Sequence, residues 1–133
     1  MNNLDQLLTT RQDIWRGTRR PQRKSVSTGC PTLDQRLPDQ GWPCGQLIEL
    51  CPNPLGSGEL EILLPLIARQ TQRTMPVMLI TPPWIPCPQT LHNAGVDLEH
   101  CLILRGDKHA LWATEQALKS GLCGAVIVWL SSQ

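Results

Sequence analysis

The sequence predicts an α/β protein in which a parallel sheet is flanked by helices. Three observations lead to this fold class. Short, continuously apolar runs alternate with longer runs of helical periodicity, and continuous apolar strands are typical of parallel sheets that are buried on both faces. Glycine and proline stand at the junctions between these runs. Hydrophobic residues make up 41% and charged residues 17% of the 133 residues, as in a globular domain.

Residues 1–16 predict an amphipathic helix. Apolar side chains recur at helical spacing, Asn2 or Asn3 can cap the helix, and Gly17 ends it. A helix of this length is marginally stable alone, so its apolar face needs a surface on the same domain or on a partner. The candidates for partner binding on this face are Leu4, Leu7, Leu8, Ile14 and Trp15.

Residues 17–26 predict a basic linker between this helix and the domain. Residues 1–24 hold six basic and two acidic residues, whereas the rest of the chain holds six basic and nine acidic ones. A basic arm of this kind is either a solvated linker or a weak contact to nucleic acid. The nucleic-acid candidates are Arg16, Arg19, Arg20, Arg23 and Lys24.

Residues 27–133 predict the α/β domain. It opens with a short helix, for which Ser27 or Thr32 is the expected cap, and continues in the order βαβαβαβ. Asp107 is expected to cap the last helix, with Leu111, Ala117 and Leu118 on its apolar side. The strands are predicted at 46–50, 76–81, 100–106 and 124–130, and the helices at 58–72, 88–95 and 107–121.

The cysteines and the apolar runs argue against several classes of protein. The six cysteines include no C-x-x-C pair, so neither a zinc ribbon nor a redox dithiol is indicated. We predict no metal site and no bound cofactor. No apolar run reaches the roughly 18 residues of a membrane span, and the N-terminus lacks the pattern of a secretory signal. A cytoplasmic protein without membrane contact is therefore expected.

Tryptophan supplies the large aromatic surface, because tyrosine and phenylalanine are absent. Aromatic side chains are favoured anchors in interfaces, and Trp42, Trp84 and Trp129 are candidates for such an exposed set. The alternative for each is ordinary core filling. Core filling is favoured for Trp129, which lies on an apolar strand. Both interpretations stay open for Trp84, which lies among prolines.

The stretch CPNPLGSGELEILL occupies the place of a phosphate-binding loop between a predicted strand and a predicted helix. Such a loop reads G-x-x-x-x-G-K-[ST]. In this register Cys51 stands first and Gly56 stands sixth. Ser57 and Gly58 then stand where lysine and serine or threonine are expected. The stretch thus predicts a degenerate loop, in which the glycines make a tight turn from strand to helix.

Several ordered motifs resemble a RecA-type core. They are Ser27-Thr28-Gly29 with Leu33-Asp34, the turn GWPCG before QLIEL, the segment LHNAGVDLEHCLI, and ALKSGLCGAVIVWL. Together they extend roughly from Ser27 to Leu130. The resemblance implies a phosphate-loop fold with a parallel sheet. In that arrangement a further strand lies between the first strand and the Walker B-like strand, so we expect a core truncated after the Walker B-like strand.

The same resemblance implies which positions have lost their chemistry. The phosphate-binding lysine falls at Ser57, the Mg²⁺-holding residue at Gly58, the catalytic glutamate at Pro83 and the Walker B aspartate at Trp129. Together these replacements remove the phosphate charge, the metal ligands and the group that positions water. We therefore expect no ATPase activity, although residual nucleotide binding remains an alternative.

The stretches RQDIWRG, GWPCGQLIEL and VIVWL resemble more specifically ImuA, the RecA-like accessory protein of damage-induced mutagenesis in bacteria. This resemblance implies a non-catalytic protein that acts by contact in SOS-induced translesion synthesis. The implied partners are an ImuB-like Y-family polymerase homologue and the error-prone polymerase complex. The alternative is a SulA-like inhibitor of cell division that binds FtsZ.

Overall fold

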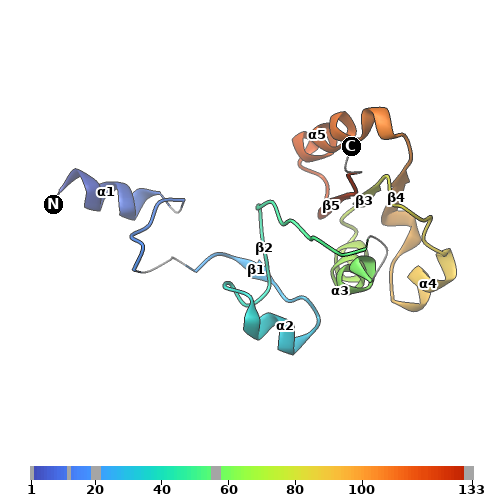
Figure 1. Ribbon diagram of the computed structural model, residues 1–133, viewed down its shortest axis with the longest axis horizontal. Helices are drawn as coiled ribbons and strands as arrows, with labels where there is room; N and C mark the ends of the chain where they lie inside the picture. Colours follow the sequence, from blue (N-terminus) through green and yellow to red (C-terminus); the bar gives the residue numbers. More distant parts are fainter. Residues whose placement is uncertain (1, 12, 19–21, 55–57, 131–133) are drawn as a thin grey trace. The chain divides into compact units, whose positions relative to one another are not determined.

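A computed structural model describes residues 2–11, 13–18, 22–54 and 58–130. The chain divides into two compact units, Met1–Ile48 and Glu49–Gln133 (Figure 1). Each unit is described by itself.

The first unit is built around a small antiparallel pair of strands. It contains α1 (Asn3–Thr10), β1 (Ser25–Val26), α2 (Pro31–Arg36) and β2 (Trp42–Pro43). In the pair, Val26 lies opposite Trp42. Glycine is required at position 41, because a Cβ there would lie 2.4 Å from the carbonyl oxygen of Val26. This close approach lets the chain turn directly into β2.

The N-terminal helix is shorter than predicted. Helix α1 ends at Thr10, and Arg11 is its extended C-terminal cap. The hydroxyls of Thr9 and Thr10 donate to backbone carbonyls of the preceding turn, which competes with continued helix. The prediction that Ile14 and Trp15 continue the helical face was wrong, since both lie beyond its end.

The second unit is a three-stranded parallel sheet. Its elements are α3 (Glu59–Gln72), β3 (Val77–Ile80), α4 (Pro88–Asn93), β4 (Cys101–Leu104), α5 (Ala110–Ser120) and β5 (Ala125–Val128), with 3₁₀ turns η1 (Leu98–His100) and η2 (Asp107–His109). The strand order is β4-β3-β5, with Val77 level with both Cys101 and Ala125. Helix α5 lies on one side of the sheet and α3 on the other (Figure 1). The predicted parallel sheet flanked by helices is thus confirmed.

The core of the second unit lies around the central strand. Val77 and Leu79 of β3 are fully buried, and so is Ile67 of α3. Burying one such side chain stabilises the fold by roughly 1.5–3 kcal/mol. The hydroxyl of the buried Thr71 donates to the Ile67 carbonyl and accepts from the Asp97 backbone amide, which ties α3 to the start of η1.

The predicted first strand at 46–50 was wrong. These residues have no regular structure, and Leu47 is 95% exposed. A strand needs a neighbouring strand to satisfy its backbone groups, and in the described residues this segment has none. The segment spans the boundary between the two units, at Ile48 and Glu49.

The expected apolar side of α5 was right for Ala117 and wrong for the two leucines. Ala110 and Ala117 are the buried residues of this helix, whereas Leu111 and Leu118 are 66% and 65% exposed. The small alanines, seven residues apart, lie on one face and allow close packing on β3 and β5. Asp107 begins a 3₁₀ turn and does not cap the helix, while Gly121 ends it in the left-handed conformation, as predicted.

Within the described residues, none of the helices has the length and apolar character needed to cross a lipid bilayer.

Candidate functional site

The stretch that aligns with the phosphate-loop pattern ends at Gly58, where α3 begins. Gly58 is the N-cap of this helix at φ 106°, a left-handed conformation that favours glycine. This geometry explains why a glycine stands where a metal-binding hydroxyl is expected. Cys51 is exposed and lies in irregular chain. Gly56 and Ser57 lie outside the described residues.

A buried carboxylate stands in the first turn of α3. Glu59 is the first residue of the helix and is only 9% exposed. Its Oε1 accepts a hydrogen bond from Nε1 of Trp129 at 3.3 Å. Sequence reasoning did not find this contact, because the two residues are seventy positions apart and only the fold brings them together.

Trp129 is fixed at the carboxyl end of the sheet. Its backbone amide donates to the Ile80 carbonyl at 3.1 Å, and its carbonyl accepts from the Thr81 hydroxyl at 2.7 Å. The residue therefore closes the ends of both β3 and β5. Its side chain is half-buried, and its indole nitrogen donates to Glu59 of α3.

The electrostatics of this end of α3 are acidic. The N-terminus of a helix carries a partial positive charge and offers backbone N–H groups to an anion. Here the side chains of Glu59 and Glu61 already lie in that first turn. Their negative charges favour the helix but oppose a phosphate at the same place.

The segment after β3 carries an exposed aromatic side chain beside Pro83. Pro83 is exposed, and it offers no side-chain acid or base. Trp84 beside it is 77% exposed, and Ile85 is 57% exposed. Because this segment follows β3, it lies at the carboxyl end of the sheet, as Trp129 does. Trp84 is thus exposed, as a partner-binding candidate must be.

The serine-threonine-glycine motif forms a closed turn in the first unit. The Asp34 carboxylate accepts from the Ser27 hydroxyl at 2.6 Å and from the Thr28 amide at 2.8 Å. These hydrogen bonds, the Ser27 bond first, lower the pKa of Asp34 below its usual range. The prediction that Ser27 or Thr32 caps α2 was wrong, since Cys30 is the N-cap and makes no side-chain capping bond.

The basic arm is partly engaged within its own unit. Arg16 pairs with Asp5 at 2.8 Å. Arg23 donates to the Gln46 side chain at 3.0 Å, and its guanidinium lies 5.6 Å from the centroid of the Trp15 ring. Lys24 is exposed. Arg19 and Arg20 lie outside the described residues.

Most residues of the predicted partner-binding face are exposed. Leu4 and Leu7 of α1 are each 47% exposed, and α1 has no buried residue. Leu8 is half-buried. Ile14 and Trp15 lie after the end of α1, and both are exposed. Of the other tryptophans considered, Trp42 is buried, so its interpretation as an exposed anchor was wrong.

Sequence reasoning missed the exposed aromatic side chain of α5. Trp112 is 64% exposed, and Leu111 and Leu118 of the same helix are exposed as well. The signal was present in the sequence as two alanines seven residues apart, which mark the buried face of a closely packed helix.

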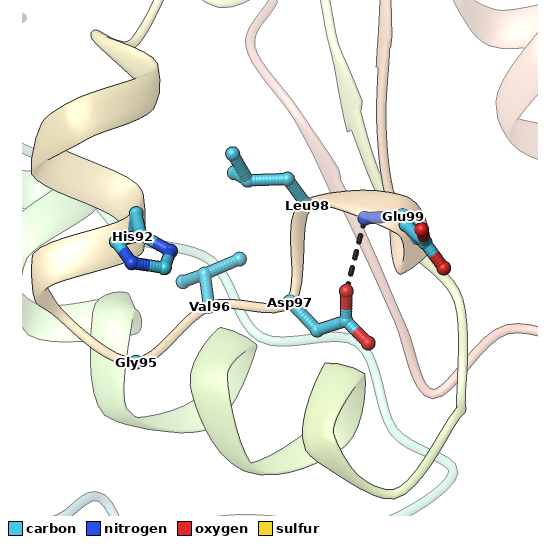
Figure 2. Close-up of a pocket in the computed structure, with 6 residues that line it drawn as sticks. All are labelled: His92, Gly95, Val96, Asp97, Leu98 and Glu99. Carbon is cyan, nitrogen blue, oxygen red and sulfur yellow. Dashed lines mark hydrogen bonds between the residues drawn. The ribbon is translucent and has the colours of Figure 1, made fainter.

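A shallow hollow of about 410 Å³ lies beside the turn from α4 to β4 (Figure 2). Asp97 accepts from the Glu99 amide at 3.0 Å, and it pairs with Nδ1 of His100 at 2.9 Å. The His100 bond, followed by the Glu99 bond, lowers the pKa of Asp97. This hollow adjoins the start of β4, at the end of the sheet opposite Trp129. It is therefore separate from the start of α3. Its lining residues are His92, Gly95, Val96, Asp97, Leu98 and Glu99.

Comparison with known proteins supports a distant relationship to RecA. No family model matches the chain. The chain is 27% identical over 106 residues to protein RecA from Clostridium acetobutylicum, an alignment that covers 78% of this chain. The chain spans about 30% of the length of that relative. The parallel sheet with helices on both sides is compatible with a RecA-like core.

Proposed function

We propose that this chain is a non-catalytic, RecA-related accessory protein that acts by contact with other proteins. The observation that carries the proposal is the pair of Glu59 and Trp129. In the RecA-type register, Trp129 takes the place of the metal-binding aspartate, and its indole donates to a carboxylate at the start of α3. An indole N–H cannot bind a cation, and the carboxylate repels phosphate.

Three further features support a role without nucleotide chemistry. Gly58 has no side-chain oxygen and holds a left-handed conformation. Pro83 has no acid or base to position water. The serine-threonine-glycine motif satisfies its polar groups with Asp34, so it needs no ligand to be stable.

The proposed process is SOS-induced translesion DNA synthesis, as in proteins that resemble ImuA. The partners are then an ImuB-like Y-family polymerase homologue and the error-prone polymerase complex. Exposed Trp84 and the exposed apolar residues of α1 supply aromatic and aliphatic anchors of the kind that dominate interfaces. The alternative partner is FtsZ, as for a SulA-like inhibitor of cell division.

Two measurements test the proposal. In isothermal titration with ATP and Mg²⁺, we expect no binding, and a micromolar affinity that EDTA abolishes would refute the non-catalytic reading. In parallel pull-downs with purified ImuB-like protein and purified FtsZ, we expect capture of the ImuB-like protein. Capture of FtsZ instead would favour the SulA-like alternative, and Trp84→Ala is the variant that should weaken either contact.

A further inference from the structure

We propose that the outer face of α5 binds the same face of a second copy of this chain, in an antiparallel two-fold contact. The outer face consists of Leu111, Trp112, Glu115, Leu118 and Lys119. The inference goes beyond the proposed function, because it concerns self-association through a helix that the proposed function does not use.

The spacing of these five residues places them on one side of the helix. At about 100° per residue, their positions fall within a sector roughly 120° wide. Glu115 stands at its centre, roughly 140–160° around the helix from Ala110 and Ala117, which are the buried residues of α5. The outer face is therefore directed away from the side of α5 that packs on β3 and β5.

The apolar part of the outer face is large for a surface in contact with water. Leu111, Trp112 and Leu118 are 66%, 64% and 65% exposed, and Leu122, just beyond the helix, is 68% exposed. Together they present roughly 400 Å² of apolar surface, within the range of patches that are often functional. Two copies that cover this face would bury roughly twice that area, which with the polar atoms at its edge approaches the smallest specific interfaces. The expected product is a weak, reversible dimer.

The charges of the outer face fit a second copy of the chain. Lys119 Nζ pairs with Glu115 Oε1 at 2.6 Å, and both side chains are exposed. In a two-fold contact each copy meets the same surface on the other, so a face with charges of one sign would repel itself. The outer face instead carries one acid and one base. In an antiparallel pair with the axis midway between them, Glu115 of each copy lies level with Lys119 of the partner subunit.

The same register brings apolar side chains together. With the axis at this place, Trp112 lies level with Leu122 of the partner subunit, and the two Leu118 side chains lie close to the axis. The exposed aromatic ring thus meets an exposed aliphatic side chain at each end of the contact. Aromatic anchors surrounded by apolar contacts are typical of the residues that dominate interfaces.

A lipid surface fits the outer face less well than a second copy does. Helices that lie on a membrane carry their charges on the polar side, opposite the apolar one. Here an acid and a base stand in the middle of the apolar side chains. Moving both charges out of water is favourable only where opposite charges and hydrogen bonds meet them, which the same face of a second copy provides.

Sedimentation equilibrium of the whole chain tests self-association. The experiment is run in reducing buffer, so that the free cysteines form no disulfide-linked dimers. We expect a monomer–dimer equilibrium with a dissociation constant of about 1–100 µM. Trp112→Lys and Leu118→Lys should each weaken it by about tenfold or more. Ile62→Lys, at an exposed position of α3, is the matched control and should leave it unchanged, and circular dichroism should show that all three variants are folded.

A mixture of two charge variants tests the face directly. Glu115→Lys makes the outer face uniformly basic and Lys119→Glu makes it uniformly acidic, so we expect each to dimerise less than the wild type and the equimolar mixture to form a heterodimer. The inference is overturned if the mixture stays monomeric, if the wild type is monomeric at about 200 µM, or if Trp112→Lys and Leu118→Lys dimerise as the wild type does.

A lipid is the other outcome that the measurement must separate. If the monomeric wild type binds vesicles of phosphatidylcholine and phosphatidylglycerol, and Trp112→Lys abolishes that binding, the outer face is a membrane contact and the inference is overturned. The proposed function stands in each of these cases, because it fails only in the separate titration with ATP and Mg²⁺ or in the pull-downs.

Discussion

The two units of this chain are stabilised by different interactions. The second unit has a conventional apolar core, in which Ile67, Val77 and Leu79 are fully buried around the central strand. In the first unit Trp42 is the buried apolar side chain among the described residues, and it is accompanied by the buried polar residues Thr28 and Asp39. There the hydrogen bonds of Asp34 organise a turn. The first unit thus depends on polar geometry, and the second on apolar packing.

The difference also shows that polar groups of each unit find partners within the chain. The serine-threonine-glycine turn is closed by groups that satisfy one another, Ser27 and Thr28 with Asp34. In the second unit, the buried carboxylate of Glu59 accepts a hydrogen bond from the Trp129 indole.

The largest expected effect tests the apolar core of the second unit. Ile67→Ala removes a fully buried side chain from the face of α3 that meets the sheet. Such a cavity costs about 2–5 kcal/mol of unfolding free energy. Chemical denaturation followed by circular dichroism should show this loss, while Ile62→Ala, which alters a side chain that is 47% exposed on the same helix, should cost far less. Equal effects of the two changes would contradict the packing described for α3.

The second-largest expected effect tests the polar hydrogen bonds of the first unit. Asp34→Asn removes the charge that the Ser27 hydroxyl and the Thr28 amide bind. Because the folded pKa of Asp34 is lowered, its stabilising contribution is fully present above the unfolded value of about 3.9, and it is lost as the pH falls through the folded pKa. The protection of the Thr28 and Gly29 amides from exchange, relative to the rate in an unfolded chain at the same pH, should therefore fall in acid.

The controls for Asp34 lie in both units. Asp13 also has a lowered pKa, but its partner Arg11 forms an exposed ion pair with it, and such pairs contribute little. Asp13→Asn should therefore leave the Thr28 and Gly29 amides unchanged. The amides of β3 should stay protected in mild acid. If they exchange as early as those of Thr28, the two units do not differ in the way described.

A smaller effect is expected at the exposed apolar face. Since α1 has no buried residue, Leu8→Glu should weaken binding to the ImuB-like partner by more than about 1 kcal/mol with little change in melting temperature. Trp15→Ala tests a separate element, because Trp15 lies beyond the helix and beside Arg23. Affinity and melting are measured on the same samples, with Cys51→Ser as the control. A large fall in melting temperature for Leu8→Glu would mean that this face is internal to the fold.

Much of the second unit could be predicted from the sequence, because its strands and helices are encoded by local periodicity. The strands β3, β4 and β5 fall inside the predicted runs, and Gly121 ends α5 as expected. The failure at 46–50 has a physical cause, since an apolar run becomes a strand only beside another strand. The exposed positions of Leu111 and Leu118 were missed because an alanine face was outweighed by larger apolar residues.

For the candidate site, the resemblance to a RecA-type core predicts that Gly58, Pro83 and Trp129 stand at positions that have lost phosphate-binding or catalytic groups, and this stays a prediction. Sequence reasoning did not identify the contact between Glu59 and Trp129, because these residues meet only through the sheet. Similarly, the sequence marked Asp34 within a motif, but the structure showed that its carboxylate organises the turn and not the helix cap.

The smallest effect concerns DNA contact through the basic arm. Two of its cations are already engaged in the first unit. Arg16 pairs with Asp5, which partly compensates its charge, and Arg23 donates to the neutral Gln46 side chain. We therefore expect weak, sequence-independent binding whose affinity falls steeply between about 50 mM and 200 mM salt. Fluorescence anisotropy with a labelled oligonucleotide measures it. Replacing Arg16, Arg19, Arg20, Arg23 and Lys24 together by glutamine should abolish binding, whereas Arg69→Gln and Arg73→Gln in the second unit should not. If binding is absent at low salt, or survives the five replacements, the arm is a linker, and the first unit acts through its apolar residues alone.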